Sequence, residues 1–339
     1  MLANAKNLEG LFKAYGKLFT DAQLAAKGRV GTHGVTLEEL AMIIKSAAKL
    51  TEHDWLNQLP GMREWIGPRV VQALDFGRLI VVNKDFEQTV GVSVNSIEDD
   101  QYGIYGARFT AMGDASMALW MQLAIKALVE NKTWADGKPF FAKNRKLKAT
   151  QAHVITNATT AAFSESAVEA ALVAMASYML TGDRPAEVTP KYMLVGPSLE
   201  KAALGMFERE LVSEGGSTVS NIMKGRLVVR VSNLLVGDHA GKWFVLGEKN
   251  TFRPVAVQQR KMPVLVAKDK PTDDNVFDKN EVLYGTHARG EAFLTMPFLA
   301  YAGGLSTVED AAGATIPETY KPPAGGGAGD DDDDGDDTP

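Results

Sequence analysis

The chain has 339 residues, 45% of them hydrophobic and 23% charged, a composition typical of a soluble globular protein long enough for two domains. It has no cysteine, which excludes disulfides, thiol nucleophiles and metal sites with cysteine ligands. Seven aspartates within residues 330–337 account for the net charge of −6, so the remaining body is nearly neutral and lacks the basic bias of a dedicated nucleic-acid-binding protein.

Membrane and secretion signals are not evident in the sequence. No apolar stretch approaches the roughly 18 residues that a membrane span needs. Residues 1–6 lack the apolar core of a signal peptide. We therefore expect a protein that is made and used in a cytoplasm-like setting, with no membrane partner.

The first 54 residues are predicted to contain two helices. Apolar residues recur at helical spacing from Leu8 to Leu18, which indicates an amphipathic helix. Thr36-Leu-Glu-Glu39 is a capping box that precedes a second apolar run. The simplest interpretation is a two-helix N-terminal lobe.

Residues 60–100 are predicted to be rich in β-structure. From Phe86 to Val94 the even positions are mostly apolar and the odd positions mostly polar, which predicts a strand with one apolar face. Arg78–Val82 is a second strand, and the turn-forming residues 83–85 between them predict a hairpin. A two-stranded ribbon is only marginally stable in water. We therefore expect this ribbon to pack on its own domain or on a neighbouring subunit.

A long helix is predicted to follow Gln101–Gly106 and to extend to about Asn131. Apolar side chains cover most of its circumference and the few charges include Asp114, Lys126 and Glu130. Such a helix must be covered on several sides. The pattern alone fits the core helix of an ordinary enzyme equally well.

The second half of the chain reads as a compact α/β unit followed by further strands. Residues 134–162 are loop-rich, and the basic run Lys143–Lys148 is interpreted as a solvated face rather than a nucleic-acid site. A helix begins after Ser164 and extends to about Met179, and Gly196-Pro197 starts another after the strand Tyr192–Val195. Further elements are strands at 226–231, 255–257, 264–266, 282–284 and 292–295, and a hairpin-like segment at 243–246.

Two prolines and the end of the chain interrupt these elements. Pro263 and Pro297 restrict their segments to sheet edges, bulges or strand ends. From Lys321 onward only proline, glycine, aspartate and small residues remain, so this segment is predicted to be disordered.

No constellation for chemistry emerges from the sequence. The five histidines lack metal-ligand spacing. Gly237–Trp243 has three residues between its glycines where a phosphate-binding loop needs four, and no Ser or Thr follows the lysine. Asp330–Gly335 matches only the first half of a calcium-binding loop. The serines sit in no nucleophile-elbow context. We therefore predict no catalytic residue, no cofactor, no metal and no enzymatic activity.

Several motifs in combination resemble one protein family. The run Leu59-Pro-Gly-Met-Arg-Glu-Trp-Ile-Gly-Pro-Arg69, followed by Asn83–Glu87, Ile97–Asp100 and Gly103–Tyr105, is similar to the major head subunit of Mu-like tailed phages. Asp136-Gly137 and Phe140-Phe141 continue the similarity, which is dense from about Trp55 to Phe141. Each motif alone is weak, and their combination is specific.

The resemblance implies an α+β protein with the Hong Kong 97 capsid fold. Its parts would be an N-terminal arm (1–54), an extended hairpin loop (55–100), a peripheral domain with a spine helix (101–159 and 251–305), an axial domain (160–250) and an acidic tail (306–339). In this reading the N-terminal segment reaches over a neighbour, and the sequence does not decide between that arm and the two-helix lobe.

The implied function is that of a major capsid protein. It would self-assemble into hexamers and pentamers of an icosahedral head that encloses double-stranded DNA, placing it in the virion, and in the host cytoplasm during assembly. Expected partners are further copies of the chain, scaffold, portal and decoration proteins, and packaged DNA by non-specific contact. Inter-subunit contacts are expected at Trp65, Arg69 and Phe86. The alternatives are the shell of an encapsulin-like nanocompartment and a soluble hydrolase.

Overall fold

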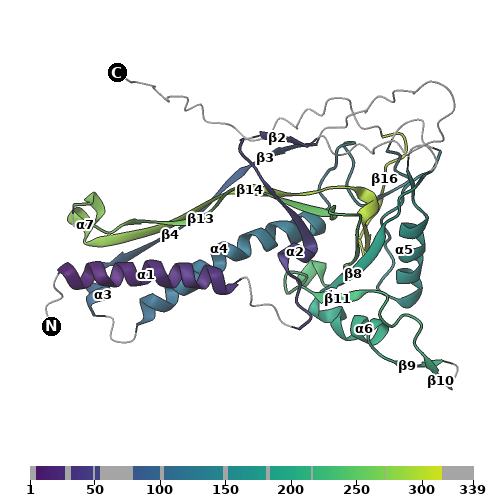
Figure 1. Ribbon diagram of the computed structural model, residues 1–339, viewed down its shortest axis with the longest axis horizontal. Helices are drawn as coiled ribbons and strands as arrows, with labels where there is room; N and C mark the ends of the chain where they lie inside the picture. Colours follow the sequence, from purple (N-terminus) through teal and green to yellow (C-terminus); the bar gives the residue numbers. More distant parts are fainter. Residues whose placement is uncertain are drawn as a thin grey trace.

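The computed structural model describes residues 5–26, 32–48, 50–53, 79–99, 103–147, 152–180, 184–214, 217–270 and 272–314. Figure 1 shows a long, narrow arm that extends to the left from a broader body on the right. Within the described ranges, no helix has both the length and the apolarity required to cross a membrane.

The arm is built on a four-stranded sheet with the order β1-β13-β14-β4 (Figure 1). Its strands are β1 (Ala41–Lys45), β13 (Val255–Lys268), β14 (Glu281–Leu294) and β4 (Lys84–Ser93). β13 and β14 run antiparallel along the arm, and α7 (Asp274–Lys279) lies in the turn between them. β13 and β14 each include two segments that were predicted as separate strands, 255–257 with 264–266 and 282–284 with 292–295. The register of β13 against β14 shifts between Gln259 and Lys261 and again between Lys261 and Val264. Pro263, which has no N–H to donate, lies within the second shift, and this confirms a bulge as one of the predicted placements of that proline.

Two helices cover one face of this sheet. α4 (Ile104–Val129) packs on β13 and β14, and α1 (Ala5–Ala26) packs on α4. The two helices approach closely at Gly113, where an added Cβ would lie 2.5 Å from the Phe19 carbonyl oxygen. The predicted long helix and its apolar circumference are confirmed, with Phe109, Trp120 and Leu128 all buried.

The far half of the arm has its own small aromatic core. Tyr15 stacks on Phe109 with ring centroids 4.6 Å apart, and Phe109 meets Tyr284 edge-on at 4.6 Å. This cluster is separate from the main core. It therefore holds α1, α4 and β14 together at a distance from the body.

The prediction of a two-helix N-terminal lobe was wrong. The capping box at Thr36 is confirmed, but α2 (Leu37–Leu40) is a single turn, after which the chain enters β1 and pairs in parallel with β13. The β-branched residues Ile43 and Ile44 favour the strand, which fits a sheet edge better than a helix.

The predicted hairpin between residues 78–82 and 86–94 was also wrong. β3 (Leu79–Val82) pairs with β2 (Leu50–His53), and β4 pairs with β14. Asn83 does not form a turn because its side chain is buried, donating to the Ala48 carbonyl at 2.8 Å and accepting from Gln258 Nε2 at 2.8 Å. The strand then ends in α3 (Val94–Glu98), so the predicted β-rich run stops short of Asp100.

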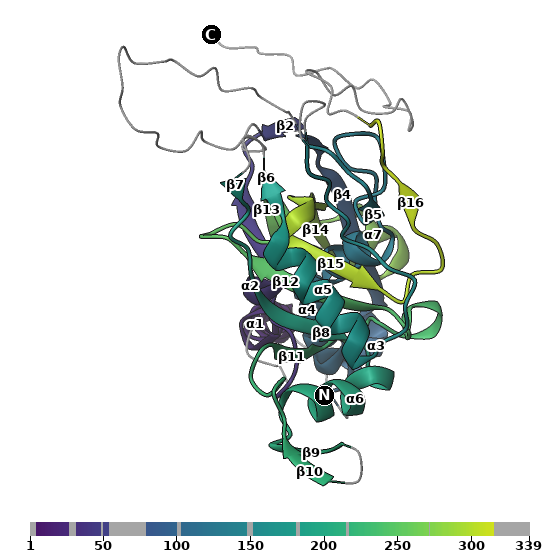
Figure 2. The ribbon, with the colours of Figure 1, turned by 90° about the vertical axis from the view of Figure 1, so that its right-hand side faces the viewer.

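The body contains a second sheet with the order β11-β8-β12-β15. Its strands are β8 (Thr189–Val195), β11 (Val228–Val231), β12 (Trp243–Glu248) and β15 (Ala300–Gly303), and the helices that pack on it are α5 (Glu165–Ser177) and α6 (Pro197–Phe207). Figure 2 shows α5 and α6 across this sheet and a small ribbon, β9 (Leu211–Glu214) with β10 (Ser217–Ser220), projecting below it.

Local signals placed the starts of both body helices correctly. Ser164 caps α5 by accepting a hydrogen bond from the Ala167 amide, and Pro197 is the first residue of α6. α5 ends at Ser177, so Met179 falls in the short strand β6 (Met179–Leu180) instead of the helix, where it pairs with β7 (Arg184–Pro185). The segment at 243–246 is not a hairpin, because β12 lies between β8 and β15.

Four short elements remain among the described residues. These are β5 (Ala142–Lys143), β16 (Glu309–Asp310), η1 (Gly237–His239) and η2 (Pro297–Leu299). β5 and β16 pair in parallel.

Candidate functional site

The described residues contain no group of three or more side chains arranged to hold a metal ion. The features that remain to carry a function are a buried polar network, the uncovered faces of the arm, its free end, and three surface hollows.

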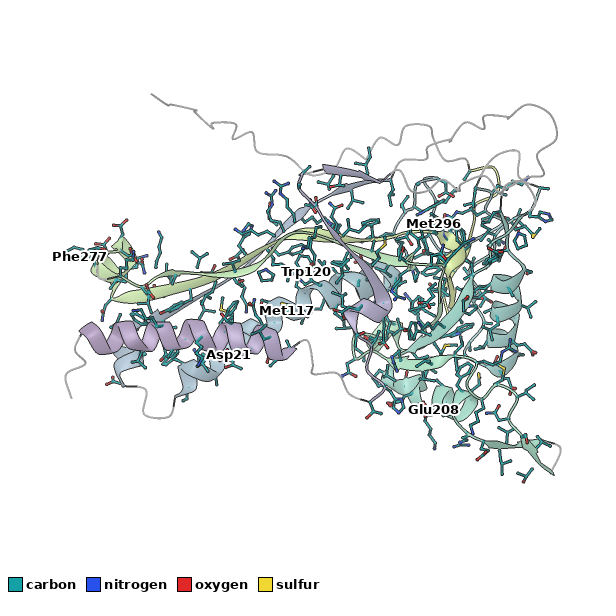
Figure 3. All side chains as sticks on the ribbon, in the orientation of Figure 1. Asp21, Met117, Trp120, Glu208, Phe277 and Met296 are labelled. Carbon is teal, nitrogen blue, oxygen red and sulfur yellow. The ribbon has the colours of Figure 1, made fainter. Side chains whose placement is uncertain are left out.

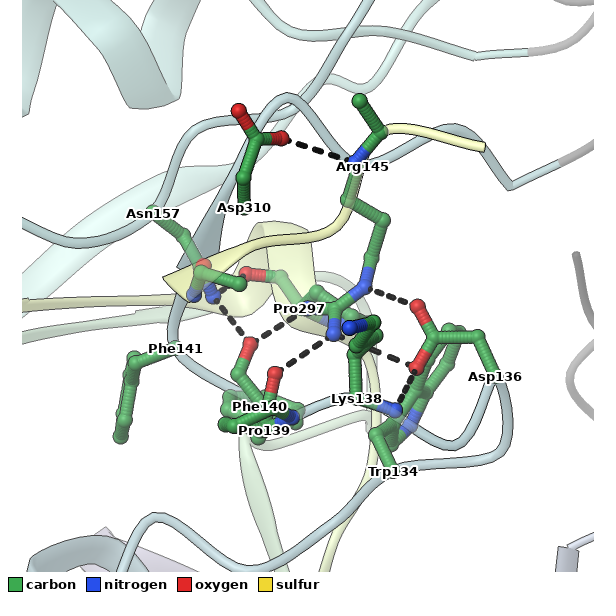
Figure 4. A network of polar contacts seen from close by, with 12 residues as sticks. Trp134, Asp136, Lys138, Pro139, Phe140, Phe141, Arg145, Asn157, Pro297 and Asp310 are labelled. Carbon is green, nitrogen blue, oxygen red and sulfur yellow. Dashed lines mark hydrogen bonds and ion pairs between the residues drawn. The ribbon is translucent and has the colours of Figure 1, made fainter. Parts of the chain in front are cut away.

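A buried ion pair lies at the junction of arm and body. Arg145 Nε lies 2.6 Å from Asp136 Oδ2, and both side chains are almost fully buried (Figure 4). The same guanidinium donates to the carbonyls of Pro139 and Phe140, and it lies over the ring of Trp134 at 5.2 Å. The planar guanidinium carries five N–H donors, so a single arginine can satisfy the carboxylate and both carbonyls. We call Arg145 with Asp136, Pro139, Phe140 and Trp134 the arginine hub.

The arginine hub corrects the interpretation of residues 143–148. Arg145 was predicted to belong to a solvated basic face, but it is 1% exposed. Periodicity could not show this, because the partner that neutralises Arg145 lies nine residues earlier in a loop. Trp134 Nε1 donates to the Thr295 carbonyl at 2.6 Å, so the hub is also fixed to the end of β14.

A second close contact fixes the spine helix to the sheet. Trp120 of α4 is fully buried against Gly290 of β14. An added Cβ at Gly290 would lie 2.7 Å from the Trp120 ring and 2.3 Å from the Gln258 carbonyl oxygen. Glycine is therefore required at this position for the helix to approach the sheet.

The N-terminal segment is linked to the body sheet by an ion pair. Arg230 of β11 donates two hydrogen bonds to the Glu39 carboxylate, which also accepts from the Thr36 amide. Burial acts to raise the pKa of Glu39, but these hydrogen bonds and the charge of Arg230 outweigh it and lower the pKa below its usual value. The pair fixes α2 against the body.

The sequence-predicted contact residues are only partly within the described chain. Trp65 and Arg69 lie outside the described residues. Phe86 pairs with Ala288 across β4 and β14 and is half-buried against the main core of its own chain. It lines a hollow of about 180 Å³ together with residues of α4. Contact of these three residues with another subunit stays a prediction.

The face of the arm sheet opposite α4 carries apolar side chains without a covering layer in the described chain. Val264 and Val266 on β13 are 51% and 58% exposed. Beside them His287 lies 3.3 Å from Asp85 and 3.2 Å from Lys261 Nζ. We call this surface the outer face.

The free end of the arm presents an aromatic side chain to solvent. Phe277 in α7 is 83% exposed, and Figure 3 shows it at the end of the arm farthest from the body. Sequence reasoning missed this residue. The available signal was a phenylalanine within Asp273-Asp-Asn-Val-Phe-Asp278, a polar turn between two apolar runs.

A family model described as Mu-like prophage major head subunit gpT matches residues 8–165, 154–234 and 228–314. The chain is 25% identical over 258 residues to the major capsid protein of Escherichia phage Mu, covering 75% of this chain and 61% of that protein. It is 24% identical over 282 residues to the Mu-like prophage FluMu major head subunit of Haemophilus influenzae, covering 83% of this chain and 68% of that protein.

A solved structure shows the same fold. The procapsid of bacteriophage JBD30 superposes with a TM-score of 0.50 at 21% sequence identity, covering 91% of this chain and 76% of that chain. The fold is therefore the Hong Kong 97 capsid fold that the resemblance implied. The chain spans 61% of the length of the phage Mu protein.

Proposed function

Because the chain belongs to the family of Mu-like prophage major head subunits, we propose that it is the structural subunit that builds the shell of a phage head. One observation carries this proposal: the family model matches residues 8–314, and so covers both the arm and the body. The protein acts by assembly and not by catalysis. The two alternatives, a nanocompartment shell and a soluble hydrolase, receive no support from this family match.

The geometry supports a protein that completes its packing with other copies. The outer face exposes the apolar side chains of Val264 and Val266, and Phe277 lies exposed at the free end of the arm. Contiguous exposed apolar surface on a soluble protein marks an interaction site. We therefore propose that the outer face is covered by a second copy in the shell, and that copies gather in hexamers and pentamers.

The domain organisation of the proposal keeps the five parts expected from the sequence, with two elements reassigned. β4 pairs with β14, so we assign residues 84–93 to the peripheral domain. β15 pairs with β12, so we assign residues 300–303 to the axial domain. The N-terminal arm, the remaining hairpin loop and the acidic tail keep their predicted boundaries.

Partners and location follow from the same proposal. The chain would reside in the virion and enclose double-stranded DNA, with scaffold and portal proteins required during assembly and decoration proteins added outside. Trp65, Arg69 and Phe86 are proposed to contact an adjacent subunit. For Trp65→Ala we expect unchanged unfolding of the subunit and impaired particle formation. Phe86→Ala should also destabilise the subunit, because Phe86 packs on its own core.

Electron microscopy and sedimentation of the full chain test the proposal. The chain should form shells alone or when produced with proteins encoded beside it, and nuclease-protected DNA in particles from infected cells separates a phage head from a protein-filled nanocompartment. Val266→Lys on the outer face should prevent shell formation. Val173→Lys is the matched control, because Val173 on α5 is exposed to a similar degree, 63% against 58%. A chain that sediments as a monomer under all of these conditions contradicts the proposal.

A further inference from the structure

The free end of the arm is an aromatic knob surrounded by acidic residues. Phe277 projects from α7, and Asp274 and Asp278 beside it are both exposed. Within residues 268–281, as far as they are described, five carboxylates stand against three lysines. A surface that receives this end must therefore supply an apolar recess and an excess of positive charge.

Three hollows lined by described residues were compared as receptors for this knob. The largest, of about 280 Å³, is lined by Met117, Trp120 and Met121 but carries Glu38 and Asp114 and no basic residue. The hollow of about 180 Å³ beside Phe86 contains Glu87 and no basic residue. Both would repel an acidic partner.

The third hollow has the complementary charge. It measures about 250 Å³ and lies under β3, where its apolar lining includes Ile80, Val82 and Phe293. Lys84 and Lys132 stand at its edge, and both pair with the single buried carboxylate of Glu291, at 2.8 and 2.9 Å. Two lysines share one acid, so the hollow retains positive charge. Pockets for small molecules usually measure about 300–1,000 Å³, so this space fits one inserted side chain better.

The knob and this hollow cannot meet within one chain. They lie at opposite ends of β14, separated by the ten residue steps from Glu281 to Glu291. At about 3.4 Å per residue, that is roughly 34 Å of extended strand. Figure 3 shows the same separation, with Phe277 at the tip and Met296 beside the body. A contact between them must join two copies.

We propose that Phe277 of one copy inserts into the hollow lined by Ile80, Val82 and Phe293 of a second copy, with Asp274 and Asp278 facing Lys84 and Lys132. This inference rests on the proposed function and names one contact through which copies join. The surfaces differ, so the contact is heterologous and head-to-tail, and each copy has both halves. Such contacts continue from copy to copy, and they close into rings or extend as open chains depending on the rotation between copies.

Engineered disulfides test the contact in a chain that has no cysteine of its own. Phe277→Cys combined with Val82→Cys should, on mild oxidation of assembled protein, give a ladder of cross-linked dimers, trimers and higher species. Each single variant should give no ladder. The matched control combines Val82→Cys with Val173→Cys, an exposed valine on α5 that lies in neither proposed contact, and should also give none. Dimers from Phe277→Cys alone would show that tips meet tips and would overturn the proposal.

Charge reversal gives an independent measure. Asp278→Lys and Lys84→Glu should each weaken self-association by about tenfold, and the double variant should return to within about threefold of the unmodified chain. Phe277→Ala should weaken it by about 30-fold, the loss expected at an interface hot spot. Thermal unfolding of Lys84→Glu checks that the subunit still folds.

The outcomes separate this contact from the proposed function. Closed particles without a ladder in the Phe277→Cys/Val82→Cys variant overturn the contact and leave the shell function intact. A ladder of open chains that never closes into particles supports the contact and contradicts the shell function. A chain that remains monomeric overturns both.

Discussion

Replacing Arg145 by methionine should reveal how much the arginine hub contributes to stability. The change keeps most of the side-chain length but leaves the Asp136 carboxylate buried without its partner. It also removes both the cation over Trp134 and the donor to the Pro139 carbonyl. Breaking a buried ion pair in this way typically costs about 3–5 kcal/mol.

The cost of the stranded charge has an upper limit, because Asp136 can take up a proton. From an ordinary aspartate pKa of about 3.9, protonation at pH 7 costs about 4 kcal/mol. The orphaned carbonyl of Pro139 adds about 1 kcal/mol. We therefore expect Arg145→Met to lower the free energy of unfolding by no more than about 5 kcal/mol at pH 7.

The penalty should depend on pH in a defined direction. In the variant the folded chain holds a proton on Asp136 that the unfolded chain lacks at pH 7, so lowering the pH stabilises the folded state. The cost should shrink by about 1.4 kcal/mol per pH unit between pH 7 and pH 5. Urea unfolding at protein concentrations below assembly, followed by tryptophan fluorescence, measures this directly.

A double variant separates charge from packing. Arg145→Met with Asp136→Asn carries no buried charge, so it should recover most of the loss and show no such pH dependence. If the single and double variants are equally unstable and neither responds to pH, the stranded carboxylate is not the source of the effect. The reasoning from the buried ion pair would then be refuted.

Three further predictions address other contacts. Gly290→Ala should destabilise the subunit by about 1–3 kcal/mol in urea unfolding, because the added Cβ would lie 2.3 Å from the Gln258 carbonyl oxygen. Gly285→Ala is the control: its Cβ would lie 3.5 Å from Thr89 Oγ1, so its free energy of unfolding should stay within about 0.5 kcal/mol of the unmodified chain. Burial raises the pKa of Tyr178, so this group ionises only in the unfolded chain and the free energy of unfolding should fall above about pH 10. Tyr178→Phe should make that fall with pH shallower by about 1.4 kcal/mol per pH unit. An unchanged slope in the variant contradicts this. Glu39→Gln should cost about 1 kcal/mol at pH 7 and nothing well below the usual glutamate pKa of 4.5, because the lowered pKa of Glu39 contributes stability that is lost as the pH falls.

Structural features that depend on neighbouring residues in the sequence were predictable. The capping box at Thr36, the cap at Ser164 and the start of α6 at Pro197 each depend on neighbours within four residues, and all three are confirmed. The apolar circumference of α4 likewise required cover on several sides, which the sheet and α1 provide. Local chemistry fixes local structure.

Features set by distant partners were not predictable in the same way. Asn83 looked like a turn residue, but its side chain bonds to the main chain at Ala48 and to Gln258, 175 positions later. Arg145 looked solvated, and only the folding of the loop toward Asp136 buries it. Phe277 was assigned no role from the sequence. Its exposure depends on where the β13–β14 turn lies relative to the body.

The position of β14 connects the proposed contact to the hub. One end of this strand adjoins the turn that carries Phe277, and Thr295 just beyond its other end accepts the hydrogen bond from Trp134 of the hub. The receiving hollow is lined by Glu291–Leu294 of the same strand. A head-to-tail contact would therefore place the tip end of one β14 against the hub end of the next. Ladder hydrogen bonds to β13 and β4 stiffen the strand between those ends, and the register shift beside Pro263 is where its partner bends. The angle between successive copies should then depend on that bulge and on the hub, whereas Phe277 determines whether the copies join.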